Sequence, residues 1–368
     1  MNVFDAGSTL VKKNGRGSVV DGCFPMFTTG SGVEADIKAG AAYAYLEAGF
    51  DSHEPWISVL IDGERIQRLP LEKGENRILL FRNMNPDEVK HVRITKDVQA
   101  IPDDAGHYCV FERIETDGTL CEYEKRPIKL EFIGDSITTG EGIIGAKKLN
   151  DWVAFCLDSV QNYTNLTAEA LNADYNVISQ SGWGVTSAWN NDPNGALPKI
   201  YTKVCGSCNA LKDRFNSLSE HDFSAFVPDV IVINLGTNDC GSLDQPEFKD
   251  PATGETFKNV KGADGQPDKM TSDRFVRTAK AFLETLHEKN PSSNLLWAYG
   301  IYSLMFWNEI KTAIEEFKKD HPDAKVYTLE FPAMTDEQAG ARFHPGPLAH
   351  RMMAEMLTEK IKDIMGLS

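Results

Sequence analysis

Four short segments of the sequence carry residues that could act together in catalysis. Ser136 stands in EFIGDSITTG, just after the apolar stretch Ile128–Ile133, and Gly182 follows a second stretch of this kind. Asn238 lies in GTND after a third stretch, and His344 precedes a proline near the end of the chain. A serine hydroxyl is a weak nucleophile until a base takes its proton, and the oxyanion it creates needs fixed donors, each worth roughly 10²–10³ in rate. Together the segments supply hydroxyl, base and donors, whereas each alone could be an ordinary turn or helix start.

The elements around these segments alternate between strand and helix from about residue 126 onward. Such alternation is typical of a parallel sheet covered by helices, and ligands of such sheets lie outside the carboxyl ends of the strands. All four segments would then meet at one edge. The expected strands are Ile128–Ile133, Tyr175–Ser179, Asp229–Leu235, Asn294–Tyr299 and Lys325–Leu329, and the expected helices are Trp152–Ala173, Asp273–Lys289, Met305–Lys319 and Ala349–Ile364, with a surface excursion at Asp244–Asp268.

The first third of the chain has a different pattern. Short runs of β-branched and aromatic residues are separated by Gly, Asp, Asn or Pro, which is typical of strands in a β-sandwich. Asp62-Gly63 carries a hairpin signal. We therefore predict a β-sandwich domain at residues 1–125 and an α/β domain at residues 126–368. The expected strands of the first are Ala41–Glu47, Trp56–Ile61, Arg77–Phe81, Lys90–Thr95 and Tyr108–Ile114.

Composition excludes several classes of function. The 368 residues carry a net charge of −16, which disfavours nucleic acid as a partner. No apolar run is long enough for a membrane span, and the N-terminus lacks the pattern of a secretory signal, so we expect a cytoplasmic protein. The seven cysteines fit reduced thiols. Cys205 and Cys208 could form half a zinc site or a redox pair, but no second such pair follows, and we expect loop thiols and no metal or cofactor. The oligomeric state stays open.

The motifs resemble those of a known family. GDSIT, GTND and the late His-Pro are similar to the blocks of SGNH, or GDSL, hydrolases. The strand-rich first third, GEG at residues 140–142 and SQSGWGV at residues 179–185 resemble carbohydrate esterase family 2 more narrowly. That resemblance covers nearly the whole chain. It implies a jelly-roll-like β-sandwich followed by a flavodoxin-like three-layer α/β/α esterase domain with a mostly parallel sheet, acting on acetylated sugars.

The resemblance also assigns roles to individual positions. It implies that Ser136 is the nucleophile and His344 the base. It implies an oxyanion hole formed by the backbone N–H groups of Ser136 and Gly182 and by the side-chain amide of Asn238. The pattern differs from a G-x-S-x-G elbow, because Thr138 stands two residues after the serine.

One position departs from the wider superfamily, whose members carry an aspartate three residues before the histidine. Here that position is Ala341, and the nearest upstream acids, Asp336 and Glu337, lie eight and seven residues before His344. A backbone carbonyl can also set the tautomer of an imidazole. We therefore expect a Ser136–His344 dyad whose histidine is held by a carbonyl of a nearby loop.

Three functions remain open at this point. The leading hypothesis is a serine esterase that removes acetyl groups from xylo- or manno-type oligosaccharides, with Trp183, Tyr302 and Trp307 as candidates to stack on a sugar ring. Aromatic residues at such positions are also common in cores. The alternatives are a lipid esterase or thioesterase on the same fold, and a carbohydrate-binding protein with a decayed catalytic domain. We expect the β domain to wall the cleft rather than to bind glycan by itself.

Overall fold

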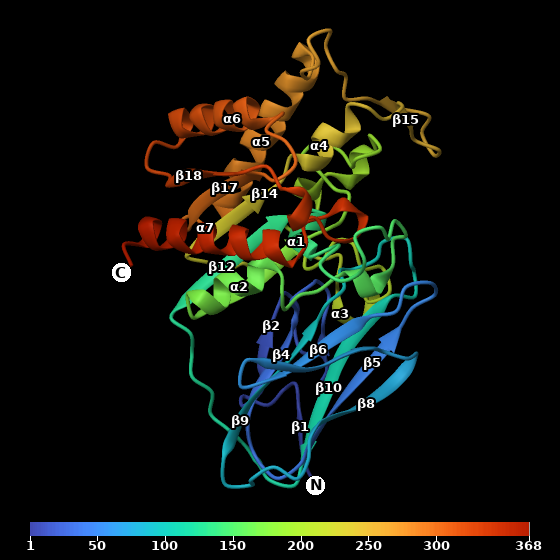
Figure 1. Ribbon diagram of the computed structural model, residues 1–368, viewed down its shortest axis with the longest axis vertical. Coiled ribbons are helices and arrows are strands. Elements are labelled where there is room, and N and C mark those ends of the chain that lie inside the picture. Colours follow the sequence, from blue (N-terminus) through green and yellow to red (C-terminus); the bar gives the residue numbers. More distant parts are fainter. Residues whose placement is uncertain (368) are drawn as a thin grey trace.

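Strands between residues 2 and 121, here called the N-terminal sandwich, form two antiparallel sheets (Figure 1). The computed structural model describes residues 1–367. One sheet contains β1 (Asn2–Asp5), β3 (Phe24–Pro25), β5 (Ala42–Gly49), β8 (Gly74–Phe81) and β10 (Tyr108–Thr116), and the other contains β2 (Lys12–Asn14), β4 (Gly32–Lys38), β6 (Trp56–Ile61), β7 (Glu64–Pro70), β9 (Val89–Lys96) and β11 (Thr119–Cys121). Buried apolar side chains of both sheets form one core. The predicted β-sandwich is confirmed, as is the β6–β7 hairpin.

One central strand of the sandwich was not predicted from the sequence. β4 pairs with β9 on one side and with β2 and β11 on the other. Its sequence, GVEADIK, carries acidic and small residues in place of the β-branched and aromatic residues that mark a strand. Glu34 nevertheless lies buried in it, because cations surround its carboxylate.

The remainder of the chain is built on a parallel sheet of order β13-β12-β14-β17-β18. Numbered along the chain, this is the 2-1-3-4-5 order of flavodoxin-like folds, as predicted. Helices α2 and α7 cover one face, and α5 and α6 cover the other (Figure 1). The strands are β12 (Ile128–Gly134), β13 (Ala173–Ser179), β14 (Val230–Asn234), β17 (Asn294–Gly300) and β18 (Val326–Phe331), and the helices are α2 (Tyr163–Ala170), α3 (Lys212–Phe215), α5 (Lys269–Lys289), α6 (Trp307–Asp320) and α7 (Pro347–Met365).

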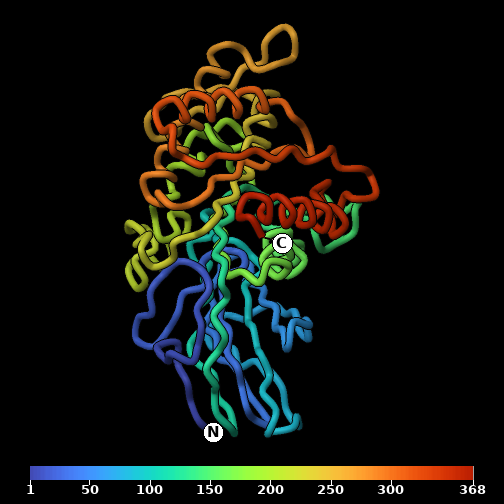
Figure 2. The backbone as a smooth tube through the Cα atoms, turned by 90° about the vertical axis from the view of Figure 1, so that its left-hand side faces the viewer, coloured from blue at the N-terminus to red at the C-terminus, as the bar shows by residue number. Residues whose placement is uncertain are grey.

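Alternate residues of the central strands face the two helical layers. Ile231 and Ile233 of β14 pack in the core with α5 and α6, whereas Val230 and Val232 pack with α2 and α7. A strand buried on both faces reads as a continuous apolar run, which is why this strand could be located from the sequence. In the excursion at residues 244–268, β15 (Phe248–Lys249) and β16 (Thr256–Phe257) form a small hairpin at the end of the molecule opposite the N-terminus (Figures 1 and 2).

The predicted helix Trp152–Ala173 is wrong over its first half. That stretch forms a short 3₁₀ helix at Ala154–Cys156, and α2 begins only after Asn162, whose side chain caps it. The apolar residues that repeat at helical spacing pack instead against the N-terminal sandwich. The ring of Trp152 lies 4.7 Å edge-on from that of His53. The periodicity therefore reflects burial between the two parts of the chain.

The two parts of the chain lie end to end (Figure 2), and the predicted boundary at residues 125 and 126 falls in the segment between β11 and β12. Their division into separate domains stays a prediction. Among the described helices, none combines the length and apolar composition that a bilayer crossing requires.

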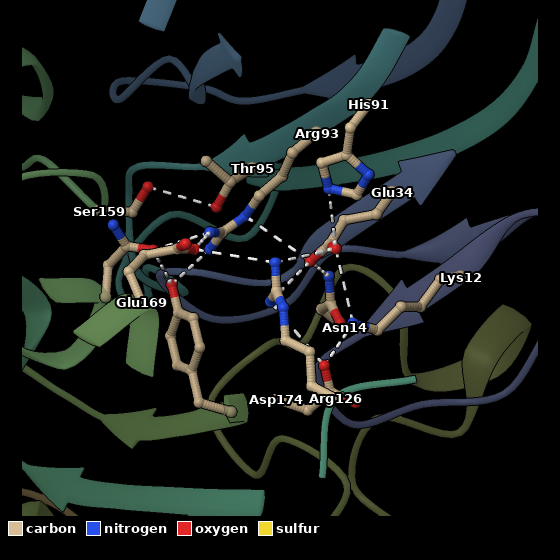
Figure 3. Close-up of polar contacts among 12 residues, drawn as sticks. Lys12, Asn14, Glu34, His91, Arg93, Thr95, Arg126, Ser159, Glu169 and Asp174 are labelled. Atoms are coloured by element: carbon tan, nitrogen blue, oxygen red, sulfur yellow. Dashed lines mark hydrogen bonds and ion pairs between the residues drawn. The ribbon is translucent and has the colours of Figure 1, made fainter. Parts of the chain in front are cut away.

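A buried cluster of charges joins the two parts (Figure 3). Glu34 of β4 lies 3.5 Å from Lys12, 3.3 Å from His91 and 3.4 Å from Arg126. Arg93 of β9 extends the cluster across the boundary, because its guanidinium donates to the hydroxyl of Tyr175 in β13 at 2.6 Å. Arg93 also pairs with Glu169 of α2, and Lys12 pairs with Asp174 of β13.

The charge of Glu34 is maintained by its surroundings. Burial alone would raise the pKa of Glu34, but the hydrogen bond from His91 and the charges of Arg93, Lys12 and Arg126 outweigh it and hold the pKa well below its ordinary value. Because Lys12 and Arg93 are buried too, loss of the carboxylate would leave their charges without a shared partner.

We predict that Glu34→Gln lowers the free energy of unfolding by about 3–5 kcal/mol, because it leaves buried cations without their shared partner. Urea denaturation measures the change. The matched control is Glu169→Gln, whose side chain is 47% exposed. That variant should cost less than about 1 kcal/mol, and an equal loss in both variants would contradict the special role of Glu34.

The same cluster predicts a pH dependence. The pKa of Glu34 is lower in the folded chain than its ordinary value of 4.5, so the stabilisation is fully present above that pH and is lost as the pH falls below it. Denaturation across this range should show the loss in the wild type, and the Glu34→Gln variant should lack this part of it.

Candidate active site

The carboxyl edge of the parallel sheet gathers the four predicted segments. Ser136 begins α1 (Ser136–Thr139) directly after β12, and Gly182 lies in the turn after β13. Asn238 lies in α4 (Thr237–Ser242) after β14, and His344 stands in the loop that leads into α7. Figure 1 shows α1 beside the start of α7.

Ser136 and His344 form a hydrogen-bonded pair. The Nε2 atom of His344 lies 2.9 Å from Oγ of Ser136, and Ser136 is only 7% exposed. On the other side of the ring, Nδ1 lies 3.1 Å from the carbonyl oxygen of Arg342. A carbonyl only accepts, so Nδ1 carries the proton there and Nε2 is left free to accept from the serine hydroxyl. The arrangement can deprotonate Ser136.

The carbonyl of Arg342 is aimed by an unusual backbone. Arg342 adopts the left-handed region with φ 56°, which a side chain disfavours by about 1–3 kcal/mol and which persists only when the surroundings enforce it. They do so here, because its N–H donates to the carbonyl of Leu149 at 2.8 Å and its guanidinium donates to the carbonyl of Asn150 and to Glu141. The long loop after α1 thus fixes the loop that carries Arg342 and His344, here called the histidine loop.

Glu141 is a site residue that the sequence reasoning missed. It is 2% exposed, its Oε1 accepts from Nε of Arg342 at 2.8 Å, and the same oxygen lies 3.7 Å from Nε2 of His344. Trp152 donates to its other oxygen at 3.2 Å. Burial alone would raise the pKa of Glu141. The charges of His344 and Arg342 and a hydrogen bond with Ser181 outweigh burial, so the pKa of Glu141 lies below its ordinary value. Glu141 lies in the GEG segment noted in the sequence, but its spacing from the other site residues did not indicate a role in the site.

The glycine after Glu141 is required by the close approach of the histidine loop. Gly142 has φ 83°, and a Cβ atom there would lie 2.5 Å from Cβ of His344. Its carbonyl accepts the N–H of Ala341 at 2.9 Å. The Gly-Glu-Gly sequence therefore places a carboxylate beside His344 while it leaves room for the ring.

The side-chain amide of Asn238 is held by two acceptors. Its Nδ2 donates to the carbonyl of Trp183 at 2.8 Å and to Oδ2 of Asp135 at 3.2 Å. The other oxygen of Asp135 accepts from the N–H of Ile137 at 3.0 Å and caps α1. Burial raises the pKa of Asp135 to about 7. These contacts fix both the start of α1 and the orientation of the predicted donor.

Gly182 lies in a tight turn. The N–H of Trp183 donates to the carbonyl of Gln180 at 3.2 Å, and Gly182 has φ 80°, as the third residue of a type II turn requires. The turn is followed by a segment that buried Asp239 braces, since its carboxylate accepts both backbone N–H groups of Val185 and Thr186 at 2.8 Å. Asp239 therefore supports the segment that follows the turn.

The aromatic candidates fall in different surroundings. Tyr302 lies beside the pair, with its ring edge-on to His344 at 6.3 Å and its hydroxyl donating to the carbonyl of Phe343 at 2.7 Å. Trp307 stacks on Tyr299 at 6.3 Å and packs against the core, and Trp183 is half-buried against the same core. Their contact with substrate stays a prediction.

Two further aromatic residues were missed because they lack a strand or motif signal. Phe343, next to His344, is 64% exposed, and Trp189, whose indole lies against Gly182, is 51% exposed. The upstream acids Asp336 and Glu337 are exposed on a short 3₁₀ helix. The ring nitrogens of His344 contact Ser136, Arg342 and Glu141 instead.

Comparison with known proteins gives matches over nearly the whole chain. Cellulase/esterase CelE of Acetivibrio thermocellus is 25% identical over 346 residues, which are 92% of this chain but 37% of that protein. An acetylxylan esterase / glucomannan deacetylase of Cellvibrio japonicus is 23% identical over 320 residues, 84% of this chain and 76% of that protein. The chain thus spans little more than a third of the length of CelE.

Solved structures show the same architecture. The acetyl xylan esterase Est2A from the rumen bacterium Butyrivibrio proteoclasticus superposes with a TM-score of 0.96 at 34% identity and covers 100% of both chains. A family two carbohydrate esterase from Clostridium thermocellum, in complex with cellohexaose, has the same fold with a TM-score of 0.79 at 24% identity, over 97% of this chain and 99% of that one. The predicted resemblance is confirmed. Residues 132–363 match the GDSL-like Lipase/Acylhydrolase family, and the chain belongs to that family.

Proposed function

We propose that this chain is a serine esterase that removes acetyl groups from acetylated oligosaccharides of the xylo or manno type. The observation that carries the proposal is the alignment of Ser136 Oγ, His344 and the Arg342 carbonyl at 2.9 and 3.1 Å. The similarity to Est2A, an acetyl xylan esterase, supports the choice of acetylated sugar.

In the first half of the reaction, Oγ of Ser136 attacks the acetyl carbonyl carbon while Nε2 of His344 takes the hydroxyl proton. The oxyanion is stabilised by the N–H groups of Ser136 and Gly182. The amide of Asn238 joins them once the oxyanion takes over one of its two N–H groups, that of the longer bond to Asp135. Collapse of the tetrahedral intermediate breaks the ester bond, and His344 returns its proton to the departing sugar oxygen. In the second half, His344 deprotonates a water that attacks the acetyl-serine. The bond between the acyl carbon and Oγ then breaks, Oγ of Ser136 takes the proton back from His344, and acetate leaves.

The imidazolium formed in each half needs a compensating charge. In a full triad, a carboxylate on Nδ1 both sets the tautomer and stabilises this cation. Here the carbonyl of Arg342 sets the tautomer, and Glu141, 3.7 Å from Nε2, supplies the negative charge. Burial of Glu141 strengthens its interaction with the cation, because few water molecules screen it.

The rim of the site favours a sugar over a long acyl chain. Tyr302 and Phe343 expose aromatic surface beside His344, and Trp189 does so beside Gly182. Aromatic rings with one wet side suit the apolar faces of a pyranose ring. We further propose that the chain works in the cytoplasm, because its seven cysteines are free thiols, and that its substrates there are oligosaccharides rather than polymer.

We predict that hydrolysis of p-nitrophenyl esters is fastest for acetate and falls toward octanoate. An NMR time course on acetylated xylo- and manno-oligosaccharides identifies the sugar and the hydroxyl. Ser136→Ala and His344→Ala should each lower kcat more than about 10³-fold, since the two act as one unit. Activity that rises with chain length would indicate a lipid esterase, and a wild type without esterase activity would indicate a binding protein.

We also predict that Glu141→Gln lowers kcat roughly 10–100-fold, because the amide keeps the shape of the side chain but removes the charge that faces the imidazolium. Asp336→Ala and Glu337→Ala are matched controls in which an exposed carboxylate is removed. They should change kcat by less than about tenfold, or about 1.4 kcal/mol of barrier. A collapse of activity in either control, with thermal unfolding unchanged, would show that a displaced acid completes a triad.

A further inference from the structure

A residue of the N-terminal sandwich contacts the turn that carries Gly182. Gln99 follows β9 and is 4% exposed, and its Oε1 accepts the backbone N–H of Ser181 at 2.7 Å. This hydrogen bond reaches from the sandwich into the loop after β13. It is therefore a direct link between the two parts of the chain next to a proposed oxyanion donor.

Contacts from both parts of the chain orient the turn. The N–H of Gln180 donates to the carbonyl of Gly134 at 3.2 Å, and the carbonyl of Gly182 accepts from Trp189 at 2.9 Å. Both of these partners come from the parallel-sheet part of the chain and hold the ends of the turn. The middle of the turn is held at Ser181, whose N–H donates to Gln99 of the sandwich and whose hydroxyl lies 3.2 Å from that of Thr139. The Ser181 N–H lies in the peptide plane just before the one that carries the Gly182 N–H, and the turn geometry sets the angle between the two planes.

Gln99 is itself fixed in place. The buried ammonium of Lys96 donates to the carbonyl of Gln99 at 3.3 Å and to that of Phe27 at 3.0 Å. Two residues before Gln99, Asp97 accepts the hydroxyl and the backbone N–H of Ser159 at 2.7 and 3.1 Å. The backbone of the segment that presents Gln99 is thus tied to both parts of the chain.

We propose that Gln99 is a positioning residue that holds the Ser181–Gly182 turn so that the Gly182 N–H points at the oxyanion. The N-terminal sandwich then completes the active site. The inference rests on the proposed function, because it takes Gly182 as an oxyanion donor. If the Gly182 N–H points away from the oxyanion, the enzyme stabilises the transition state less, while its binding of the substrate changes little.

The test compares Gln99→Leu, which removes the acceptor at similar size, with Gln99→Glu, which keeps an accepting oxygen. Gln99→Leu should lower kcat for p-nitrophenyl acetate roughly tenfold and change KM less than about twofold. It should weaken inhibition by a small alkylboronic acid, whose adduct with Ser136 mimics the tetrahedral intermediate, by a similar factor. Gln99→Glu should recover most of both. Arg214→Leu, which removes another hydrogen bond between the two parts, the exposed one to Glu47 at 2.7 Å, is the matched control and should retain wild-type kcat.

Amide hydrogen exchange at Ser181 gives a readout that needs no catalysis. Exchange should be slow in the wild type and in Gln99→Glu, and faster in Gln99→Leu. Unchanged kcat and boronate inhibition in Gln99→Leu, or an equal loss in both Gln99 variants, would overturn the inference while the esterase assignment stands. A wild type that hydrolyses no ester would overturn the proposed function, and unchanged exchange in Gln99→Leu would then show separately that the contact does not hold the turn.

Discussion

The orientation of His344 depends on one carbonyl oxygen, that of Arg342. A neutral acceptor at 3.1 Å holds a ring less firmly than a carboxylate does, so the position of the carbonyl has to come from the loop itself. The left-handed backbone at Arg342, its hydrogen bond to Leu149 and the tight contact between Gly142 and His344 together supply that rigidity. The loop after α1 and the loop before α7 thus contact each other next to the imidazole and hold it in place.

The same need for rigidity extends to the N-terminal sandwich. Buried charges cost free energy unless they are fully paired, yet the Glu34 cluster places several of them where the two parts of the chain meet. Arg93 links that cluster to Tyr175 in β13, the strand that ends just before Gly182. A specific polar interface allows fewer relative placements than an apolar one. Gln99 contacts the turn through a separate hydrogen bond that involves no charged group.

The sequence revealed what depends on local pattern. Strands buried on both faces, such as β14, read as apolar runs, and the serine, glycine, asparagine and histidine segments could be assigned to the edge where such strands end. β4 escaped because Glu34 occupies a place where an apolar residue was expected. The stretch after Trp152 was taken for helix because docking against the sandwich produced a similar spacing of apolar residues.

Contacts between distant residues could not be seen in the sequence. Glu141 and Arg342 are 201 residues apart, and Gln99 and Ser181 are 82 apart. Neither contact follows from a regular spacing of residues in the sequence, because each depends on how two loops meet in space. Tyr302 could be proposed from its place after a strand, whereas Phe343 and Trp189 became visible only through their exposure.

A triad carboxylate both sets the tautomer of the histidine and stabilises the imidazolium. Here Arg342 contributes to both effects. Its backbone carbonyl accepts from Nδ1 and sets the tautomer of His344, while its side chain holds Glu141 near Nε2 at the other side of the ring. The guanidinium of Arg342 also pairs with Glu141 at 2.8 Å. In the proposed reaction the proton is transferred to Nε2, where the carboxylate of Glu141 is already in place. A fixed charge that does not reorganise stabilises a developing cation at the lowest cost in barrier, so the absence of an acid at Ala341 need not disable the site.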